Sequence, residues 1–367
     1  MAAESWMPQQ LAKHSSGPQA PTGPQAPTSP QALTREPGCP KHMVFGPCGG
    51  VRADLSCEMA PHRCPFTERS APPGWPEPDQ AAAPASALLD ALRSRPVVVT
   101  DLTLPAYDAE AVARITAVLA GSCDALLVGE HQNRPDFPPT LMASLIRQAG
   151  GTGWLTLTCR DRNRLVLEQE LIGLRTAGAD GVLCVTGDGR AEGVRPGVPQ
   201  VFDLDGTRLA GLAASLGLPV AVPEAPAAPP RWLRPARLLQ KQRAGAQLAF
   251  LNHAGSAAEL AGFVRASRDA GVTIALIAGV AVYTDPRSAH VLQNFPGLHL
   301  DPEPVARVLA AADPVAAGIE AAVTEAHQLL AIDGIDGVNL SGLASGRGEY
   351  QAAEVKAKIG SRIRSQL

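Results

Sequence analysis

The sequence is poor in aromatic side chains and in long apolar runs. Phe, Trp and Tyr make up 4 % of the 367 residues, whereas 45 % are hydrophobic, so a core would be built mainly of small aliphatic side chains. The longest apolar runs have the length of a strand, which argues against a transmembrane helix of about 20 residues. The amino terminus lacks the charged start and apolar core of a secretory signal. We therefore expect a soluble, cytoplasmic protein.

An excess of charge of either sign is also missing. The formal net charge is −3, so neither a nucleic acid nor an anionic membrane is expected as a partner. The length suffices for one large domain with additions. No Gly-x-Gly-x-x-Gly motif follows the first expected strand, which weighs against a doubly wound dinucleotide-binding sheet.

Cysteine is scarce except in one short segment, which carries four of the seven: Cys39, Cys48, Cys57 and Cys64. Their spacing, C-x8-C-x8-C-x6-C, matches neither a close CxxC pair nor the usual ferredoxin run. Without a secretory signal, such a cluster favours a metal over disulfides. Four thiolates suit Zn²⁺ or an iron–sulfur cluster. Two alternatives remain: His42 or His62 replaces one cysteine, or all four are reduced and bind no metal.

Composition divides the chain into four parts. Residues 1–36 are rich in Pro and Gln and repeat GPQAPT in tandem, which predicts a disordered tail. Residues 37–70 form a metal-binding module of four cysteines, too small and too rich in Pro and Gly to hold together by burial alone. Residues 71–92 form a linker that ends in a short helix at 86–93. Residues 93–367 form the main domain.

The main domain alternates short apolar runs with helical periodicity. Strands are predicted at 97–100, 125–128, 154–158, 181–185, 218–222, 246–251, 273–277 and 337–340. Helices are predicted at 108–120, 138–149, 164–177, 204–216, 235–244, 257–270, 286–330 in two parts, and 350–364. Eight strands that alternate with eight helical segments predict a (β/α)8 TIM barrel, with an open sheet as the alternative.

Polar motifs follow two neighbouring strands of this pattern. The strand at 154–158 runs into LTCRDRN at 157–163, and the strand at 181–185 ends at Thr186-Gly187-Asp188. The carboxyl ends of parallel strands are where active sites usually lie. The two motifs, at this distance, resemble those of the flavin-dependent methylenetetrahydrofolate reductase family. The cysteine segment independently resembles the small domain that is fused to or paired with some bacterial members. The shared residues are Cys39-Pro40-Lys41, Gly46-Pro47-Cys48-Gly49-Gly50, Cys57-Glu58 and Cys64.

The resemblance covers about residues 37–70 and 95–345. It implies FAD at the carboxyl mouth of the barrel, reduced by NADH, NADPH or a partner protein. The substrate would be methylenetetrahydrofolate, converted to 5-methyltetrahydrofolate by hydride transfer. It also implies two catalytic residues. Asp101, where the family has Glu, would be the general acid, and Asp188 would tune hydride transfer electrostatically. The alternatives are that Asp101 caps a loop and that Asp188 forms a turn.

The resemblance further implies a set of cofactor and substrate contacts. Cofactor-binding residues would be Thr158, Arg160, Asp161, Asn163, Gly187, Asp188, Asp203 and Lys241. As alternatives, Arg160, Asp161 and Asn163 form a salt-bridge network that shapes their loop, Asp203 caps a helix, and Lys241 is an exposed helical lysine. Asn252 would bind the folate where the family has Gln, and His253 is expected to be solvated. The Gly- and Ser-rich segment 338–346 is a weaker candidate, as a phosphate-binding loop.

A second class of function is open because Asp101 and Asn252 are both shorter than the family's residues. The barrel would then bind folate or a methyl carrier without flavin chemistry, or pass hydride directly from the nicotinamide. The Cys module would serve as a docking or electron-transfer element. The expected partners are a second copy of the chain, or a complex with an electron-donor or methyltransferase subunit.

Overall fold

The computed structural model describes residues 35–76, 84–130, 135–190, 193–295 and 297–367. The predicted tail, except Arg35 and Glu36, and the middle of the predicted linker lie outside these residues. None of the described helices is long and apolar enough to cross a membrane.

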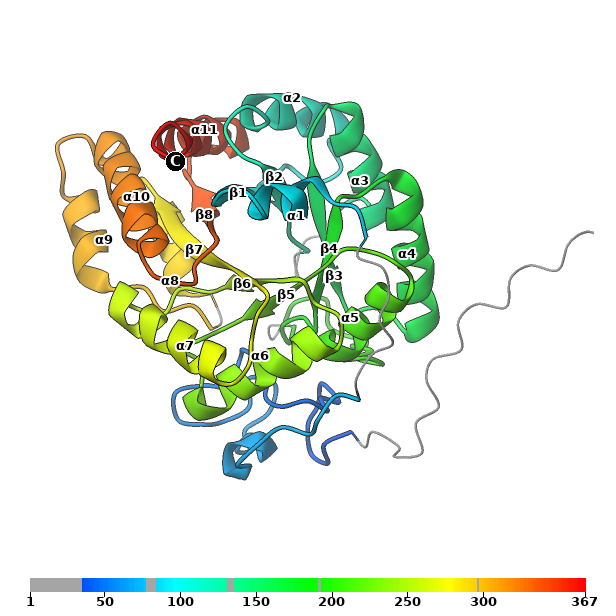
Figure 1. Cartoon of the computed structure of the whole chain (residues 1–367). Helices are drawn as coiled ribbons and strands as arrows, with labels where there is room; N and C mark the ends of the chain where they lie inside the picture. The colour runs from blue at the N-terminus through cyan, green and yellow to red at the C-terminus, as the bar shows by residue number, and fades with distance from the viewer. Residues whose placement is uncertain (1–34, 77–83, 131–134, 191–192, 296) are drawn as a thin grey trace, which may run out of the picture. The chain divides into compact units, whose positions relative to one another are not determined.

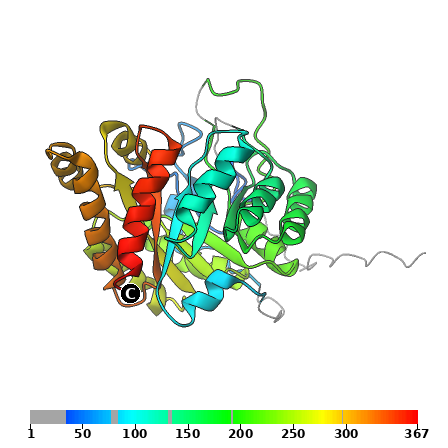
Figure 2. The ribbon, with the colours of Figure 1, turned by 90° about the horizontal axis from the view of Figure 1, so that it is seen from above.

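Eight parallel strands close into a barrel in the order β1 to β8, as the sequence predicted. The strands are β1 (Val97–Leu102), β2 (Ala125–Val128), β3 (Gly153–Thr158), β4 (Gly181–Val185), β5 (Val220–Glu224), β6 (Leu248–Leu251), β7 (Ala275–Tyr283) and β8 (Gly337–Ala344). Closure is completed by β1 and β8, which pair from Val97↔Gly337 to Thr100↔Leu340. Figures 1 and 2 show the ring of helices around the strands. The fold is a (β/α)8 TIM barrel.

The helices follow the strands in alternation. They are α1 (Ala87–Leu92), α2 (Ala109–Leu119), α3 (Pro139–Gln148), α4 (Arg164–Ala177), α5 (Gly206–Ser215), α6 (Arg234–Arg243), α7 (Ala257–Asp269), α8 (Pro286–Gln293), α9 (Pro302–Leu309), α10 (Pro314–Leu330) and α11 (Glu349–Arg364). In α4, Asn163 caps the first turn by accepting from the Val166 N–H, and Gly178 ends the helix at φ 76°. These signals are local, which is why the bounds predicted for α4 match the structure.

Three predicted elements differ from the structure by more than a few residues at their ends. The segment predicted as 286–330 contains three helices rather than two, because Asp301-Pro302 and Asp313-Pro314 each start a new helix. β7 continues to Tyr283, well beyond the predicted end. β8 continues to Ala344, so most of the segment at 338–346 is strand and not a phosphate-binding loop. Its backbone groups up to Ser341 belong to the ladder with β7.

Side chains alternate between two apolar layers along each strand. In β1, Val97 and Val99 fill the barrel interior, whereas Val98 and Leu102 pack against the helices. The alternation therefore directs Asp101 into the barrel at its carboxyl end. At the opposite end α1 joins the interior cluster through Leu88, which is fully buried.

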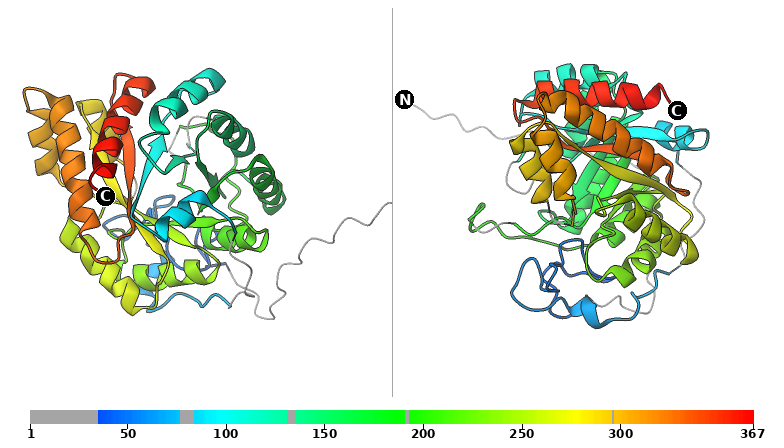
Figure 3. Two further views of the ribbon diagram at one scale, coloured as in Figure 1. Left: turned by 45° about the horizontal axis from the view of Figure 1, so that its top comes forward. Right: turned by 90° about the vertical axis from the view of Figure 1, so that its left-hand side faces the viewer.

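The Cys module, described over 35–76, has almost no regular secondary structure. It contains one short 3-10 helix, η1 (Pro65–Glu68), and one isolated bridge between Ser56 and Arg63. Its own apolar cluster is small and consists of Met43, Val51, Cys64 and Phe66, with Cys39 and Cys48 packed against it. Figure 3 shows the module, in blue, lying against the barrel. The contacts with the barrel must therefore supply much of what holds the module in place.

Candidate functional site

Asp101 lies at the point where β1 and β8 stop pairing. Its Oδ1 accepts from the Asn339 Nδ2 at 2.8 Å, and its Oδ2 accepts from the Gly342 N–H at 3.3 Å. Its main-chain oxygen accepts from the Lys356 Nζ of α11 at 2.8 Å. Burial lowers the pKa of Lys356 to about 8, against the opposing effect of the Asp101 carboxylate. Where the main-chain pairing of β1 and β8 ends, the Asp101 side chain thus continues the contact between the two strands, and these bonds hold it at the barrel mouth.

Two buried oxygen atoms at this mouth have no hydrogen-bond partner: Thr158 Oγ1 and Asn339 Oδ1. Buried polar atoms are nearly always bonded, so these two are exceptions among the side chains at the mouth. The main-chain N–H of Thr158 is already used, since it donates to Glu130 Oε2 at 2.7 Å. That carboxylate also pairs with Arg162, at 2.6 Å between Arg162 Nη2 and Glu130 Oε1.

The Thr186-Gly187-Asp188 segment leaves β4 at the same edge. Gly187 has φ +92°, and a Cβ there would lie 3.1 Å from Arg160 Cβ and 3.3 Å from Thr158 Cβ. Both the conformation and the tight surroundings thus favour glycine here. Burial raises the pKa of Asp188, Lys41 opposes this and Glu58 adds to it. Within the described part of the chain no donor bonds the Asp188 carboxylate, which leaves its oxygens free for a ligand.

The Cys module brings two charged side chains to this edge. Lys41, 3 % exposed, donates to the Gly187 carbonyl at 2.6 Å and forms an ion pair with Glu58. Glu58 in turn accepts from the Gly189 N–H at 3.3 Å and from Cys48 Sγ at 3.1 Å. The sequence analysis gave neither residue a role at the site. Their positions beside Cys39-Pro40 and Cys57 were the available signal.

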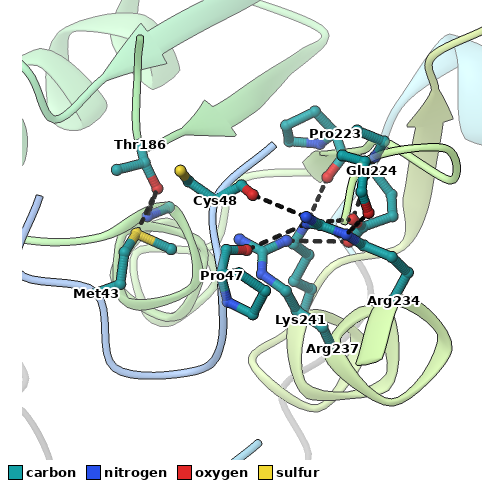
Figure 4. Close-up of polar contacts among 12 residues, drawn as sticks. Met43, Pro47, Cys48, Thr186, Pro223, Glu224, Arg234, Arg237 and Lys241 are labelled. Atoms are coloured by element: carbon teal, nitrogen blue, oxygen red, sulfur yellow. Dashed lines mark hydrogen bonds and ion pairs between the residues drawn. The ribbon is translucent and has the colours of Figure 1, made fainter. Parts of the chain in front are cut away.

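A second buried charge cluster, which the sequence analysis also missed, joins the module to β5 and α6 (Figure 4). Glu224 pairs with Lys241 at 2.7 Å, Arg237 at 3.0 Å and Arg234 at 3.4 Å. Burial alone would raise the pKa of Glu224, but the three cations lower it to about 2. Burial and the neighbouring Arg237 lower the pKa of Lys241 to about 7.

Arg234 connects this cluster to the module through main-chain carbonyls. Its guanidinium donates to Pro47 O at 3.2 Å and to Cys48 O at 2.9 Å. On the β4 side Thr186 Oγ1 lies 3.5 Å from Met43 Sδ, and Asp205 accepts from the Val44 N–H at 2.8 Å. The module is thus fixed against the carboxyl ends of both β4 and β5.

Several predicted cofactor residues already have partners in the chain. Asn163 is the cap of α4. Asp161 accepts from Arg160 Nε at 2.9 Å and pairs with Arg190. Lys241 is bound to Glu224 rather than exposed on its helix.

Asp203 is not the cap of the following helix, because Asp205 accepts from the Arg208 N–H and caps α5. Asp203 instead accepts from the Arg164 N–H at 2.8 Å. Asn252 follows β6 at the mouth, and its main-chain N–H donates to Glu224 O at 2.9 Å.

The four module cysteines are all reduced and fall into two groups. Burial raises the pKa of Cys39 and of Cys64, and each has Cys57 as an electrostatic neighbour that adds to the shift. Cys48 faces Lys41 and Glu58 instead, and burial raises its pKa to about 12. Among the described residues no three His, Cys, Asp or Glu side chains are arranged to hold a metal ion. A metal in the module therefore remains a prediction.

Comparison with known proteins adds no assignment. No family model and no curated protein matches the chain. Solved structures similar to it include a protein from Aquifex aeolicus (14 % identity, TM-score 0.46, covering 76 % of this chain and 96 % of that one). Tryptophan synthase from M. tuberculosis is 14 % identical with a TM-score of 0.43, covering 76 % of this chain and 97 % of that one. Thiamine phosphate pyrophosphorylase from Pyrococcus furiosus is 13 % identical with a TM-score of 0.39, covering 74 % of this chain and 98 % of that one. Likenesses at this level carry no argument about activity.

Proposed function

We propose that the chain is a flavin-dependent reductase that acts on methylenetetrahydrofolate at the carboxyl mouth of its barrel. The observation that carries this proposal is the pair of carboxylates at that edge. Asp101 is presented by β1, and Asp188 by the loop after β4. Burial raises the pKa of Asp188, and its oxygens lack donors within the described residues. Such a carboxylate is free to act on a bound group.

Some of the residues at the mouth offer polar groups that a flavin or a folate could contact. Thr158 Oγ1 and Asn339 Oδ1 are two buried oxygen atoms without a partner in the described residues, and the Asp188 carboxylate likewise has no donor there. FAD, when bound, would supply hydride to the methylene carbon of the substrate. Asp101 would protonate the folate nitrogen that leaves the methylene bridge. Asp188 would stabilise the charge that develops near it, and Asn252 would bind the pterin.

The remaining parts of the proposal concern reductant and assembly. NADH, NADPH or a partner protein would reduce the flavin, and the Cys module would hold Zn²⁺ or an iron–sulfur cluster. The support for a metal is the small apolar core of the module, which is weak on its own and which a metal would stabilise. The module would also be the docking point for a second subunit, in a cytoplasmic enzyme.

The two half-reactions, measured separately under anaerobic conditions, test this proposal. Flavin should be bleached by NADH, by NADPH or by a chemical reductant that stands in for a partner, and re-oxidised by methylenetetrahydrofolate. Asp188→Asn should slow the second step by about 10- to 1,000-fold, the range typical of losing one electrostatic group. Asp333→Asn, an exposed position in the loop before β8, is the matched control and should change neither step. A wild-type protein that binds FAD but is not re-oxidised by the folate would contradict the proposal.

One observation favours a second candidate, a folate- or methyl-carrier-binding barrel without flavin. Asp161, Asn163 and Lys241, three side chains expected to bind flavin, are already bonded to other residues of the chain. A flavin would have to compete with these partners. Tight binding of tetrahydrofolate together with no uptake of FAD would support this candidate over the reductase.

A further inference from the structure

His253 is buried at the barrel mouth, although a histidine in that loop was expected to be solvated. It follows the end of β6 and is 7 % exposed. Its Nε2 lies 3.2 Å from Ser341 Oγ on β8, and its Nδ1 lies 3.5 Å from Glu325 Oε1 on α10. The imidazole thus lies between a hydroxyl and a carboxylate, an order of groups suited to moving a proton.

The barrel leaves space for this imidazole where β6 and β7 separate. Their pairing ends at Leu251↔Ala278. The next residue of β7 is Gly279, and a Cβ there would lie 3.1 Å from Leu251 O and 3.4 Å from His253 Nε2. A side chain at this position would therefore crowd the ring. Glu325 is itself fixed, because its Oε2 accepts from the Ala281 N–H at 3.0 Å.

The hydrogen bonds around Ser341 accommodate both charge states of the histidine. When Glu325 accepts from Nδ1–H, Nε2 is left to face Ser341. A charged imidazole donates from Nε2 to Ser341 Oγ, while the hydroxyl donates to Val280 O, 3.0 Å away. A neutral imidazole accepts, and the hydroxyl turns toward it. The hydroxyl then gives up its bond to Val280 O in favour of Nε2.

Ser341 also lies beside the predicted acid. Asn339 and Ser341 are two residues apart on β8 and so share the inward face of the strand. Asn339 and Gly342, on either side of Ser341, both donate to the Asp101 carboxylate. β8 thus carries one polar strip that faces the mouth, and Ser341 is only partly buried there.

We propose that Ser341, His253 and Glu325 form a proton relay that serves the substrate at the barrel mouth. In this relay the one proton that the reaction consumes comes from Ser341 rather than directly from Asp101. Ser341 gives it to the substrate nitrogen and takes the Nε2 proton of the imidazolium, while the Asp101 carboxylate stays the acceptor of Asn339 and Gly342. The ring is left neutral and is recharged from solvent. Ser341 is the catalytic residue, and His253 and Glu325 are positioning residues that act through it. The choice of a folate nitrogen as acceptor rests on the proposed function, whereas the relay rests on its own geometry.

The other titratable groups near the relay come from β7 and from the loop after α8. Glu325 acts on Tyr283 of β7, whose pKa burial raises to about 12, so Tyr283 stays neutral at working pH. The main-chain N–H of His299 donates to His253 O at 3.2 Å. Within the described residues Glu325 is the one acidic side chain that forms an ion pair with His253.

The test measures the folate-dependent re-oxidation of flavin in His253→Gln and Ser341→Ala. Both should slow this step by about 100-fold, the lower range for general acid catalysis, and remove a titrating limb from its pH profile. Reduction of the flavin by the nicotinamide should stay unchanged. His290→Gln, an exposed histidine on α8 that bonds Asn294, is the matched control and should behave as wild type. A His253→Gln protein with wild-type rate and pH profile overturns the relay.

A second measurement does not depend on turnover. The relay requires a hydrogen bond from the Nδ1–H of His253 to Glu325, whose Oε1 lies 3.5 Å away, and this proton should give a low-field proton NMR signal that Glu325→Gln abolishes and His290→Gln does not. Absence of this signal from the wild type overturns the relay whatever the reaction is. Presence of the signal in a protein that never re-oxidises with the folate instead overturns the proposed function and the folate nitrogen as acceptor.

Discussion

The charge balance around Glu224 leads to a prediction that can be worked out quantitatively. One fully buried carboxylate faces three cations, at 2.7 Å (Lys241), 3.0 Å (Arg237) and 3.4 Å (Arg234). Glu224→Gln keeps the size of the side chain and removes its charge. The two guanidinium groups would then lie together without an anion, and Lys241, whose pKa of about 7 the carboxylate helps to keep up, would lose its proton. Loss of one cation, in contrast, leaves the carboxylate still paired.

Two estimates of the cost of Glu224→Gln agree. Breaking a buried ion pair by removing one partner typically costs about 3–5 kcal/mol. The pKa of Glu224 falls from 4.5 to about 2 on folding, and this shift corresponds to about 3 kcal/mol. Because the folded-state pKa is the lower one, this stability is present above pH 4.5. It is lost as the pH falls from about 4.5 through about 2.

Two matched variants show whether the cost of Glu224→Gln is specific to the buried carboxylate or follows from the loss of any charged side chain. Lys241→Met removes one of three cations and the hydrogen bond to Pro223 O, and relieves repulsion from Arg237. We expect it to change stability by less than about 1 kcal/mol, since the two effects oppose each other. Glu259→Gln removes an exposed partner of Arg231, 3.2 Å away, and should also cost less than about 1 kcal/mol.

Urea unfolding followed by circular dichroism compares the free energies of unfolding of the variants. The dependence of this free energy on urea concentration should be the same for each variant. For a domain of this size about 1 kcal/mol corresponds to roughly 2–4 °C in Tm, so Glu224→Gln should lower the midpoint of heating by a readily measured amount. The reasoning is refuted if Glu224→Gln unfolds at the wild-type midpoint. It is equally refuted if Lys241→Met is as costly as Glu224→Gln.

Three further predictions concern the site. Gly187→Ala, crowded by Arg160 and Thr158, should cost at least about 1 kcal/mol more than Gly217→Ala, which has positive φ and open space; equal unfolding midpoints would contradict this. Cys48→Ser should retain more metal than Cys39→Ser on elemental analysis, since Cys48 bonds Glu58 apart from the other thiols; equal loss would show a four-thiolate site. As the pH is lowered, activity that needs ionised Asp188 should be lost already above the usual aspartate range, because burial raises the pKa of this carboxyl group. The acidic limb of the pH–rate profile should be missing in Asp188→Asn.

Most of the barrel was predictable because its signals are local. Short apolar runs marked all eight strands, and the bounds of β2, β4 and α4 match the prediction. The errors also have local causes. The pattern over 338–346 is rich in Gly and Ser, which indicates a loop, but β7 pairs with the segment through Ser341 and again at Ala344. Pairing between strands outweighs the intrinsic preference of the residues.

The candidate site was predictable only in part because its contacts join distant segments. The position of Asp101 followed from its strand, and the alternation along β1 placed it inside the barrel. Lys41 and Gly187 are 146 residues apart, and no sequence period relates them. His253 looked solvated because its burial depends on Gly279 and Glu325, which lie on other elements.

The measurement that tests the central claim most directly is the visible absorption spectrum of the anaerobically purified protein, with metal analysis of the same sample. The proposal predicts a flavin spectrum, either as purified or after addition of FAD, that NADH, NADPH or a chemical reductant bleaches and methylenetetrahydrofolate restores. Stoichiometric zinc or iron would identify what the module holds. A protein without flavin that takes up no added FAD would contradict the reductase and favour the folate-binding barrel.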